Sequence, residues 1–191
     1  MRVTHHLLEG VRFVPAKCVS ARPFTPLAVV VHYTAGRTLE GAVRTLTKPP
    51  VRKPDGKLAG ASAHVVIGRD GSLVQLVSFD RIAWHAGPSS WRERDRCNDW
   101  MIGIELVNLG CHRATAALPE SDVVVIGGKR WQVFPEPQLA TLEQVVAALR
   151  VGYSTLVELV GHEHIAPRRK LDPGPAFPWQ RFGGAPPTPA P

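Results

Sequence analysis

The pattern of apolar and polar residues along the chain predicts a mixture of strands and helices. Residues 27–33 read LAVVVHY, an unbroken apolar and β-branched run that is typical of a strand covered on both faces. Residues 39–46 repeat apolar side chains at i, i+3, i+4 and i+7, and Thr38 before them is a suitable N-cap. This segment therefore predicts a short amphipathic helix, and His32 stands near the end of the strand before it.

The rest of the chain continues this mixed pattern. Residues 62–67 and 73–77 each have the pattern of a strand, and the turn Gly-Arg-Asp-Gly lies between them, which predicts a hairpin. Residues 48–60 combine Pro and Gly turn signals with four lysines or arginines and predict a polar loop, and residues 87–99 are polar and irregular. The remaining expected elements are a strand at 102–107, a surface hairpin of 123–126 and 131–134, a helix from Glu136 and a strand at 156–160.

These elements predict one α/β domain with a central mixed β-sheet flanked by helices. A chain of 191 residues suits a single domain with a sizeable core. We expect the domain to span residues 27–182, after an N-terminal extension at 1–26, with a probable insertion at 111–134. Residues 183–191 read GGAPPTPAP and predict a flexible tail.

Composition narrows the class of protein. With 44% hydrophobic and 20% charged residues, the chain is neither disordered nor fibrous. The first 26 residues contain no apolar run of the length that a secretory signal needs, and no later stretch reaches about 18 apolar residues, the length of a membrane span. The sequence therefore predicts a protein that is cytoplasmic as synthesised and does not insert into membranes. Three irregularly spaced cysteines predict reduced thiols rather than a disulfide framework.

The charge favours an anionic partner. A net charge of +7 and a pI near 9.8 suit either a cell-wall polymer or a nucleic acid. The chain carries no helix-turn-helix, zinc-finger or RNP signature, so we expect no nucleic-acid partner.

Three features predict one catalytic site. His32 ends an apolar strand, Glu105 is the only charged residue of the predicted strand IGIELV, and His162 and Asp172 lie in GHEHIAPRRKLDPGPAF. A catalytic zinc takes three protein ligands and leaves a position for water, so His32, His162 and Asp172 form a suitable set. Taken singly, each of the three is as readily interpreted as a residue that caps a strand or a turn.

The order of the motifs supports the catalytic interpretation. VVVHYTAG, SAHVVIGRDG, AWHAG, RCND, IGIEL and GHEHIAPRRKLDPGPAF occur as they do in N-acetylmuramoyl-L-alanine amidases. The chain thus resembles the AmpD-like, type 2 amidase family, which includes phage lysozyme-type amidases and peptidoglycan recognition proteins. The resemblance covers roughly residues 27–182 and implies the fold of that family.

The resemblance also implies a mechanism. It assigns His32, His162 and Asp172 as zinc ligands and a zinc-bound water as the nucleophile. Glu105 corresponds to the glutamate that acts as general base, and Lys170 to the lysine that stabilises the oxyanion. For Glu105 and Lys170, an ion pair and a solvated loop charge are the alternative interpretations.

Further motif residues are expected to bind substrate. His64, Trp84 and His85 belong to motifs near the family's groove, although a strand histidine or a tryptophan between alanines is often part of a core. Arg96 and Arg169 resemble arginines that bind carboxylates of the stem peptide, a bidentate task that suits guanidinium. Cys97 lies beside Arg96, and we expect it to be structural.

The implied function is zinc-dependent cleavage of the amide between N-acetylmuramic acid and L-alanine. The substrate is either intact peptidoglycan, degraded by a phage-type lysin released to the cell wall, or a soluble anhydro-muropeptide, and the basic charge makes us favour the lysin. A non-catalytic peptidoglycan-binding module is the alternative, and the sequence leaves the oligomeric state open.

Overall fold

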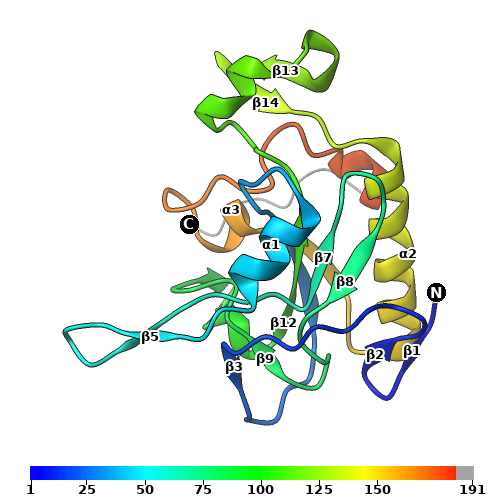
Figure 1. Cartoon of the computed structure of the whole chain (residues 1–191). Coiled ribbons are helices and arrows are strands. Elements are labelled where there is room, and N and C mark those ends of the chain that lie inside the picture. The colour runs from blue at the N-terminus through cyan, green and yellow to red at the C-terminus, as the bar shows by residue number, and fades with distance from the viewer. Residues whose placement is uncertain (184–191) are drawn as a thin grey trace.

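A computed structural model describes residues 1–183 and places a five-stranded mixed sheet at the centre of the protein (Figure 1). The strand order is β15-β4-β12-β7-β8, and the first four strands are parallel while β8 runs antiparallel to β7. This arrangement confirms the predicted mixed α/β sheet. The five strands are β4 (Ala28–Tyr33), β7 (Val65–Ile67), β8 (Leu73–Gln75), β12 (Met101–Leu106) and β15 (Glu158–Gly161).

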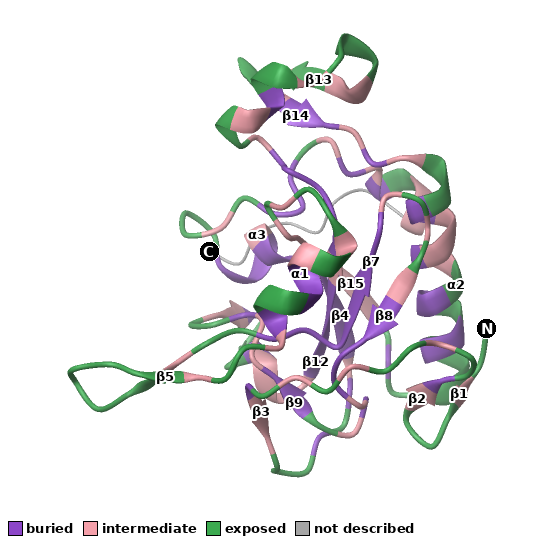
Figure 2. Ribbon diagram, viewed as in Figure 1, coloured by how far each residue is buried: buried purple, intermediate pink, exposed green. Residues whose placement is uncertain are grey.

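One face of the sheet is covered by the long helix α2 (Glu136–Gly152). Alternate residues of the central strands, such as Val29, Val31 and Ile104, join Leu142 and Leu149 of this helix in the largest apolar cluster. Figure 2 shows the buried residues running along the central strands and along one side of α2. Residues 28–31 are apolar without interruption because both faces of that part of the strand are covered.

The other face carries the short helix α1 (Leu39–Leu46) and, beside it, the polar cluster described below. Thr38 caps α1 as predicted, because its Oγ1 accepts from the Gly41 amide at 3.1 Å. Val43 of α1 and Val66 of β7 belong to the same apolar cluster, and the two elements are in contact. The helix therefore covers the sheet near β7 and leaves the ends of β4 and β12 open.

Short elements surround the sheet. The prediction of a polar loop at 48–60 is wrong in part, because β5 (Val51–Arg52) and β6 (Leu58–Ala59) form a two-stranded hairpin within it. The hairpin predicted at 123–126 and 131–134 is confirmed as β13 (Val123–Ile126) paired with β14 (Lys129–Gln132), although the second strand begins two residues earlier than predicted. The peripheral elements are β1 (Val3–Thr4), β2 (Leu7–Leu8), β3 (Val19–Ser20), β5 (Val51–Arg52), β6 (Leu58–Ala59), β9 (Ile82–Ala83), β10 (Ser90–Trp91), β11 (Arg94–Asp95), β13 (Val123–Ile126), β14 (Lys129–Gln132) and the single-turn helix α3 (His162–Ile165).

The first 26 residues pack on the domain. Leu8 is buried and its amide donates to Gln75 Oε1 at 2.8 Å, and the Ser62 hydroxyl donates to the Cys18 carbonyl at 2.6 Å. Cys18, Cys97 and Cys111 are free thiols. The tail expected to be flexible lies, apart from Gly183, outside the described residues.

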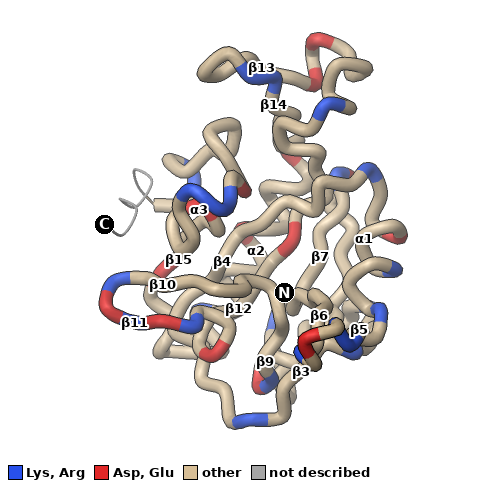
Figure 3. The backbone as a smooth tube through the Cα atoms, turned by 90° about the vertical axis from the view of Figure 1, so that its left-hand side faces the viewer, with Lys and Arg blue, Asp and Glu red and all other residues tan. Residues whose placement is uncertain are grey.

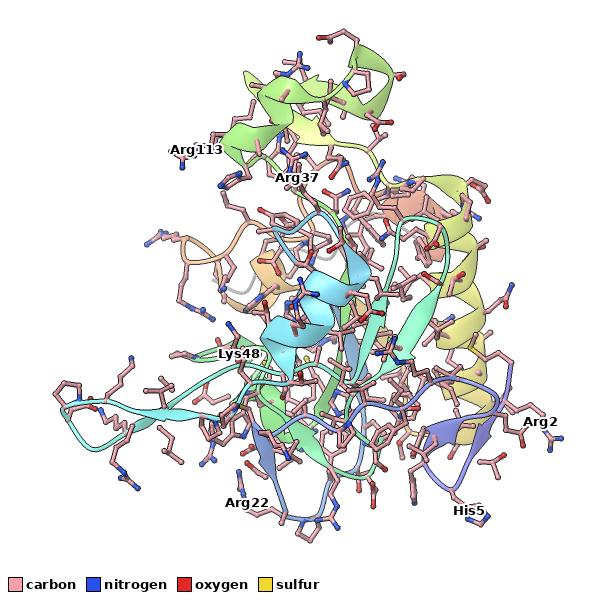
Figure 4. All side chains as sticks on the ribbon, in the orientation of Figure 1. Arg2, His5, Arg22, Arg37, Lys48 and Arg113 are labelled. Carbon is pink, nitrogen blue, oxygen red and sulfur yellow. The ribbon has the colours of Figure 1, made fainter. Side chains whose placement is uncertain are left out.

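Basic side chains lie mostly at the periphery. Figure 3 shows Lys and Arg on the β5–β6 hairpin and in the segment beside α3. Arg2, Arg22 and Arg113 point outward from the edges of the molecule (Figure 4). Within the described residues, no helix is both long and apolar enough to cross a membrane.

Candidate active site

Three potential metal ligands meet where two parallel strands end. His32 is the fifth residue of β4, His162 directly follows β15, and Asp172 comes from the loop after α3. His32 Nδ1 lies 2.8 Å from His162 Nδ1, and each of these nitrogens lies 3.0 Å from Asp172 Oδ2. All three residues are buried, with Asp172 at 8% exposure. The carboxyl ends of parallel strands are where α/β sheets place their ligands, and this sheet does the same.

Hydrogen bonds on the far side of each ring indicate which nitrogens face the centre. His162 Nε2 lies 3.0 Å from the Ala86 carbonyl, which can only accept, so the imidazole proton is on Nε2 and Nδ1 carries a lone pair. His32 Nε2 lies 3.0 Å from His85 Nδ1. Burial lowers the pKa of His32 to about 4, so this imidazole is neutral. Two ring nitrogens, of which His162 Nδ1 carries a lone pair, therefore converge with a carboxylate oxygen, an arrangement that a cation between them would stabilise.

The donor set fits zinc. Two histidine nitrogens and one aspartate oxygen form a three-ligand catalytic set with a position left for water, and tetrahedral bonds of about 2.0–2.1 Å would hold the donors about 3.3 Å apart. The observed separations of 2.8–3.0 Å need to widen by only a few tenths of an ångström on that estimate. Among the described residues, no other group of three His, Cys, Asp or Glu ligands is close enough to hold a metal.

Glu105 lies next to this cluster. In β12 it is the partner of His32 in the parallel register, so both side chains project from the same face of the sheet. Its Oε2 is shut off from solvent and has no hydrogen-bond partner. Burial, helped by the charge of Asp172, raises the pKa of Glu105 from 4.5 to about 8. A partly buried carboxyl group whose proton affinity is raised in this way suits a general base that works near neutral pH.

A cleft of about 420 Å³ gives access to these groups. Lys170, which is partly buried, lines it with Glu105 and the three potential ligands. Arg169 also lines the cleft, but its Nη2 donates to the Ala86 and Pro88 carbonyls at 2.6 Å each. The structure thus brings six of the ten predicted site residues to one cleft, and His85 is a seventh at its floor.

The other three predicted site residues lie apart from the cleft. His64 is completely buried, and its nitrogens contact the Arg81 carbonyl and the Gly103 amide, so it presents no atom to a substrate. The Trp84 indole donates to Ser20 Oγ, and Arg96 pairs with Asp99 at 3.0 Å. Trp84 and Arg96 line a neighbouring hollow of about 370 Å³.

Comparison with known proteins assigns a family to this site. The sequence profile of Amidase_2, described as N-acetylmuramoyl-L-alanine amidase, matches residues 22–175. The chain belongs to this family. The 1,6-anhydro-N-acetylmuramyl-L-alanine amidase AmpD of Escherichia coli is 38% identical over 187 residues, which span 92% of this chain and 91% of AmpD.

Solved amidase structures share the fold. A selenomethionine derivative of AmpD superimposes with a TM-score of 0.75 at 33% identity and covers 95% of this chain and 97% of its own. The amidase AmiD of E. coli, in complex with the substrate anhydro-N-acetylmuramic acid-L-Ala-D-γ-Glu-L-Lys, superimposes with a TM-score of 0.65 at 31% identity, over 85% of this chain and 58% of its own. The protein is thus an N-acetylmuramoyl-L-alanine amidase with the type 2 amidase fold.

Some groups of this amidase site were missed by the sequence analysis. Asn98 Oδ1 accepts from the His85 and Ala86 amides at 3.0 and 2.7 Å, and Gly103 lies directly under the His85 ring. Tyr33 and Thr34 line the cleft beside His32. Asn98 and Gly103 stand inside the motifs RCND and IGIEL, which is the one signal that could have identified them.

The raised pKa of Glu105 predicts a pH-dependent stability for the metal-free amidase. An unfolded Glu105 ionises near 4.5, whereas the folded one holds its proton up to about 8. Folding of the wild type is therefore penalised progressively between these pH values, by at most about 1.4 kcal/mol per pH unit, and the penalty is constant above pH 8. Glu105→Gln removes the titrating carboxyl group and with it this penalty, so the variant should gain stability relative to the wild type as the pH rises across this window. Urea unfolding of both metal-free proteins from pH 5 to pH 9 tests this, and parallel profiles would contradict it.

Proposed function

We propose that this amidase uses zinc held by His32, His162 and Asp172 to cleave the amide between N-acetylmuramic acid and L-alanine in soluble 1,6-anhydro-muropeptides. The observation that carries the proposal is the convergence of two histidine nitrogens and an aspartate oxygen within 3.0 Å of one another, beside the partly buried Glu105, whose buried Oε2 has no hydrogen-bond partner. The 38% identity to AmpD over nearly its whole length supports the substrate class.

The chemistry divides between the metal and the chain. Bound zinc polarises a carbonyl and lowers the pKa of water. Glu105 takes a proton from the attacking water and delivers it to the amide nitrogen as the C–N bond breaks, which leaves a muramyl carboxylate and a free L-alanyl amine. Lys170, at the wall of the cleft, stabilises the negative charge that develops on the carbonyl oxygen.

The surroundings suit an anionic substrate. Arg169 and Lys170 border the cleft, and the chain carries a net charge of +7. Carboxylates of a stem peptide would be attracted to this edge. We propose that Arg169 contributes to this attraction while it also ties the loop at Ala86 and Pro88, and that Trp84 and Arg96 form a neighbouring part of the substrate groove.

This proposal departs from the preference for a lysin drawn from the basic charge. AmpD of E. coli, which this chain matches over 91% of its length, is a 1,6-anhydro-N-acetylmuramyl-L-alanine amidase, and the structure of AmiD was solved with an anhydro-muramyl peptide. We therefore propose a role in the cytoplasm on soluble fragments rather than on the intact wall.

Mass spectrometry of the products tests the function. The purified amidase is incubated with anhydro-N-acetylmuramyl tripeptide and, separately, with intact sacculi, each with and without a chelator and then with zinc restored. We expect release of anhydro-N-acetylmuramic acid and the L-Ala-headed peptide from the soluble substrate, loss of this activity with chelator, and recovery with zinc. Sacculi should be cleaved slowly.

Other outcomes would replace parts of the proposal. Equal cleavage of sacculi would restore the lysin, and cleavage of another bond would remove the assigned reaction. A zinc-loaded protein that binds the soluble substrate and cleaves neither would be a peptidoglycan-binding module.

A further inference from the structure

His85 lines the cleft, and its ring contacts His32 Nε2, on the side of the His32 ring away from His162 and Asp172. Its Nδ1 is 3.0 Å from His32 Nε2, and its Nε2 is 3.0 Å from the Met101 carbonyl. The His32 and His85 rings meet edge to face, with centroids 5.1 Å apart. Its motif AWHAG first suggested a substrate contact, but the geometry points to another role.

The Met101 carbonyl determines where the protons of this chain lie. A carbonyl oxygen only accepts, so His85 donates from Nε2, and its Nδ1 is left as an acceptor. That acceptor faces His32 Nε2, which must then carry the His32 proton. The lone pair of His32 is thereby directed from Nδ1 toward His162 and Asp172.

We propose that His85 is a positioning residue that fixes the tautomer and ring orientation of His32 for zinc binding. This inference rests on the proposed zinc site and deepens it. Partners behind a metal-ligating histidine fix its tautomer and raise its basicity, and their loss usually costs 10- to 100-fold in metal affinity.

The surroundings hold His85 in one place. The Asn98 carboxamide accepts from the main-chain amides of His85 and Ala86. Gly103 leaves the space that the ring occupies, because a Cβ at that position would lie 2.4 Å from His85 Cγ. The position of His85 is therefore fixed by the hydrogen bonds of Asn98 to the main chain and by the packing of its ring on Gly103 of β12.

The same short segment also serves the second histidine. The Ala86 carbonyl accepts from His162 Nε2 at 3.0 Å. The same carbonyl also accepts from Arg169 Nη2 at 2.6 Å. The pair His85-Ala86 therefore orients both potential histidine ligands, one through a side chain and one through the main chain. A role confined to packing would not require acceptors aligned with both Nε2 atoms.

Zinc affinity tests the inference with three variants of the full chain. His85→Leu keeps much of the volume but removes the acceptor, and His85→Asn retains an oxygen at about the place of Nδ1. Gln75→Leu is the matched control, since Gln75 is buried and accepts from the Leu8 amide but lies outside the cleft. The zinc dissociation constant is measured for zinc alone by competition with a chromophoric chelator, on folded protein.

We expect His85→Leu to weaken zinc binding 10- to 100-fold, His85→Asn to recover most of this loss, and Gln75→Leu to lower the thermal unfolding temperature without changing zinc affinity. Unchanged affinity in His85→Leu, an equal loss in His85→Asn, or an equal loss in Gln75→Leu would each overturn the role. A wild type that binds no zinc would instead refute the proposed function.

A measurement on the wild type covers the case in which the variants do not fold. Nitrogen-15 NMR should show the N–H of His32 at Nε2 and a coupling across the hydrogen bond to His85 Nδ1 in the zinc-loaded protein. A His85 ring that carries its proton on Nδ1 would overturn the inference.

Discussion

Replacing Glu105 with glutamine is expected to lower kcat by about 10²- to 10⁴-fold while zinc stays bound. Glutamine has the size of glutamate but cannot accept the proton of the attacking water. The loss should be large because Glu105 lies in register with His32, has a buried Oε2 without a partner and has a pKa raised to about 8. Steady-state kinetics on the anhydro-muropeptide, with zinc content measured on the same sample, tests this.

Glu163 provides the matched control. It is also a partly buried carboxyl group near Asp172, and burial raises its pKa to about 7, but it does not line the cleft. Glu163→Gln should therefore keep a kcat close to that of the wild type. If Glu105→Gln turned over substrate normally, or if both variants lost activity equally, Glu105 would not be the general base.

The sheet could be predicted from sequence because its signal is strong and local. The run at 27–31 is apolar at every position, and residues 28–31 are buried on both faces of β4. Helix α2 begins at Glu136 as predicted. The β5–β6 hairpin was missed because Val51 and Leu58 are 68% and 51% exposed, so no buried face imposes an alternating pattern on it.

The site was predicted from motifs more than from periodicity. The sequence places His32 at a strand end, but it gives no reason why residues 130 and 140 positions later should meet it. Only the fold shows that β4 and β15 are neighbours and that the loop after α3 returns to them.

Two histidines show the limit of motif assignment. His64 and His85 both come from family motifs and were both expected at the substrate. The structure completely buries His64 between Arg81 and Gly103, and it places His85 against His32. Contacts between residues 53 positions apart depend on the sheet and its loops, so no local pattern distinguishes these two rings.

Replacing Asp172 with alanine is expected to abolish stable zinc binding and, with it, catalysis. Asp172 supplies the one anionic donor of the cluster, with Oδ2 3.0 Å from both histidine nitrogens. Since the loss of a partner behind a ligand costs 10- to 100-fold, the loss of a ligand itself should weaken zinc affinity by more than about 100-fold. Metal analysis after dialysis against a chelator, and competition titration of zinc, measure this directly.

Zinc-linked stability separates a lost ligand from a damaged fold. Zinc that binds only the folded state raises the free energy of unfolding, so the wild type should melt at a higher temperature when zinc is added, whereas Asp172→Ala should not respond. Asp99→Ala is the control, because Asp99 pairs with Arg22 and Arg96 away from the cluster. That variant should respond to zinc like the wild type. An Asp172→Ala protein that retained zinc through dialysis and melted later with added zinc would remove Asp172 from the ligand set.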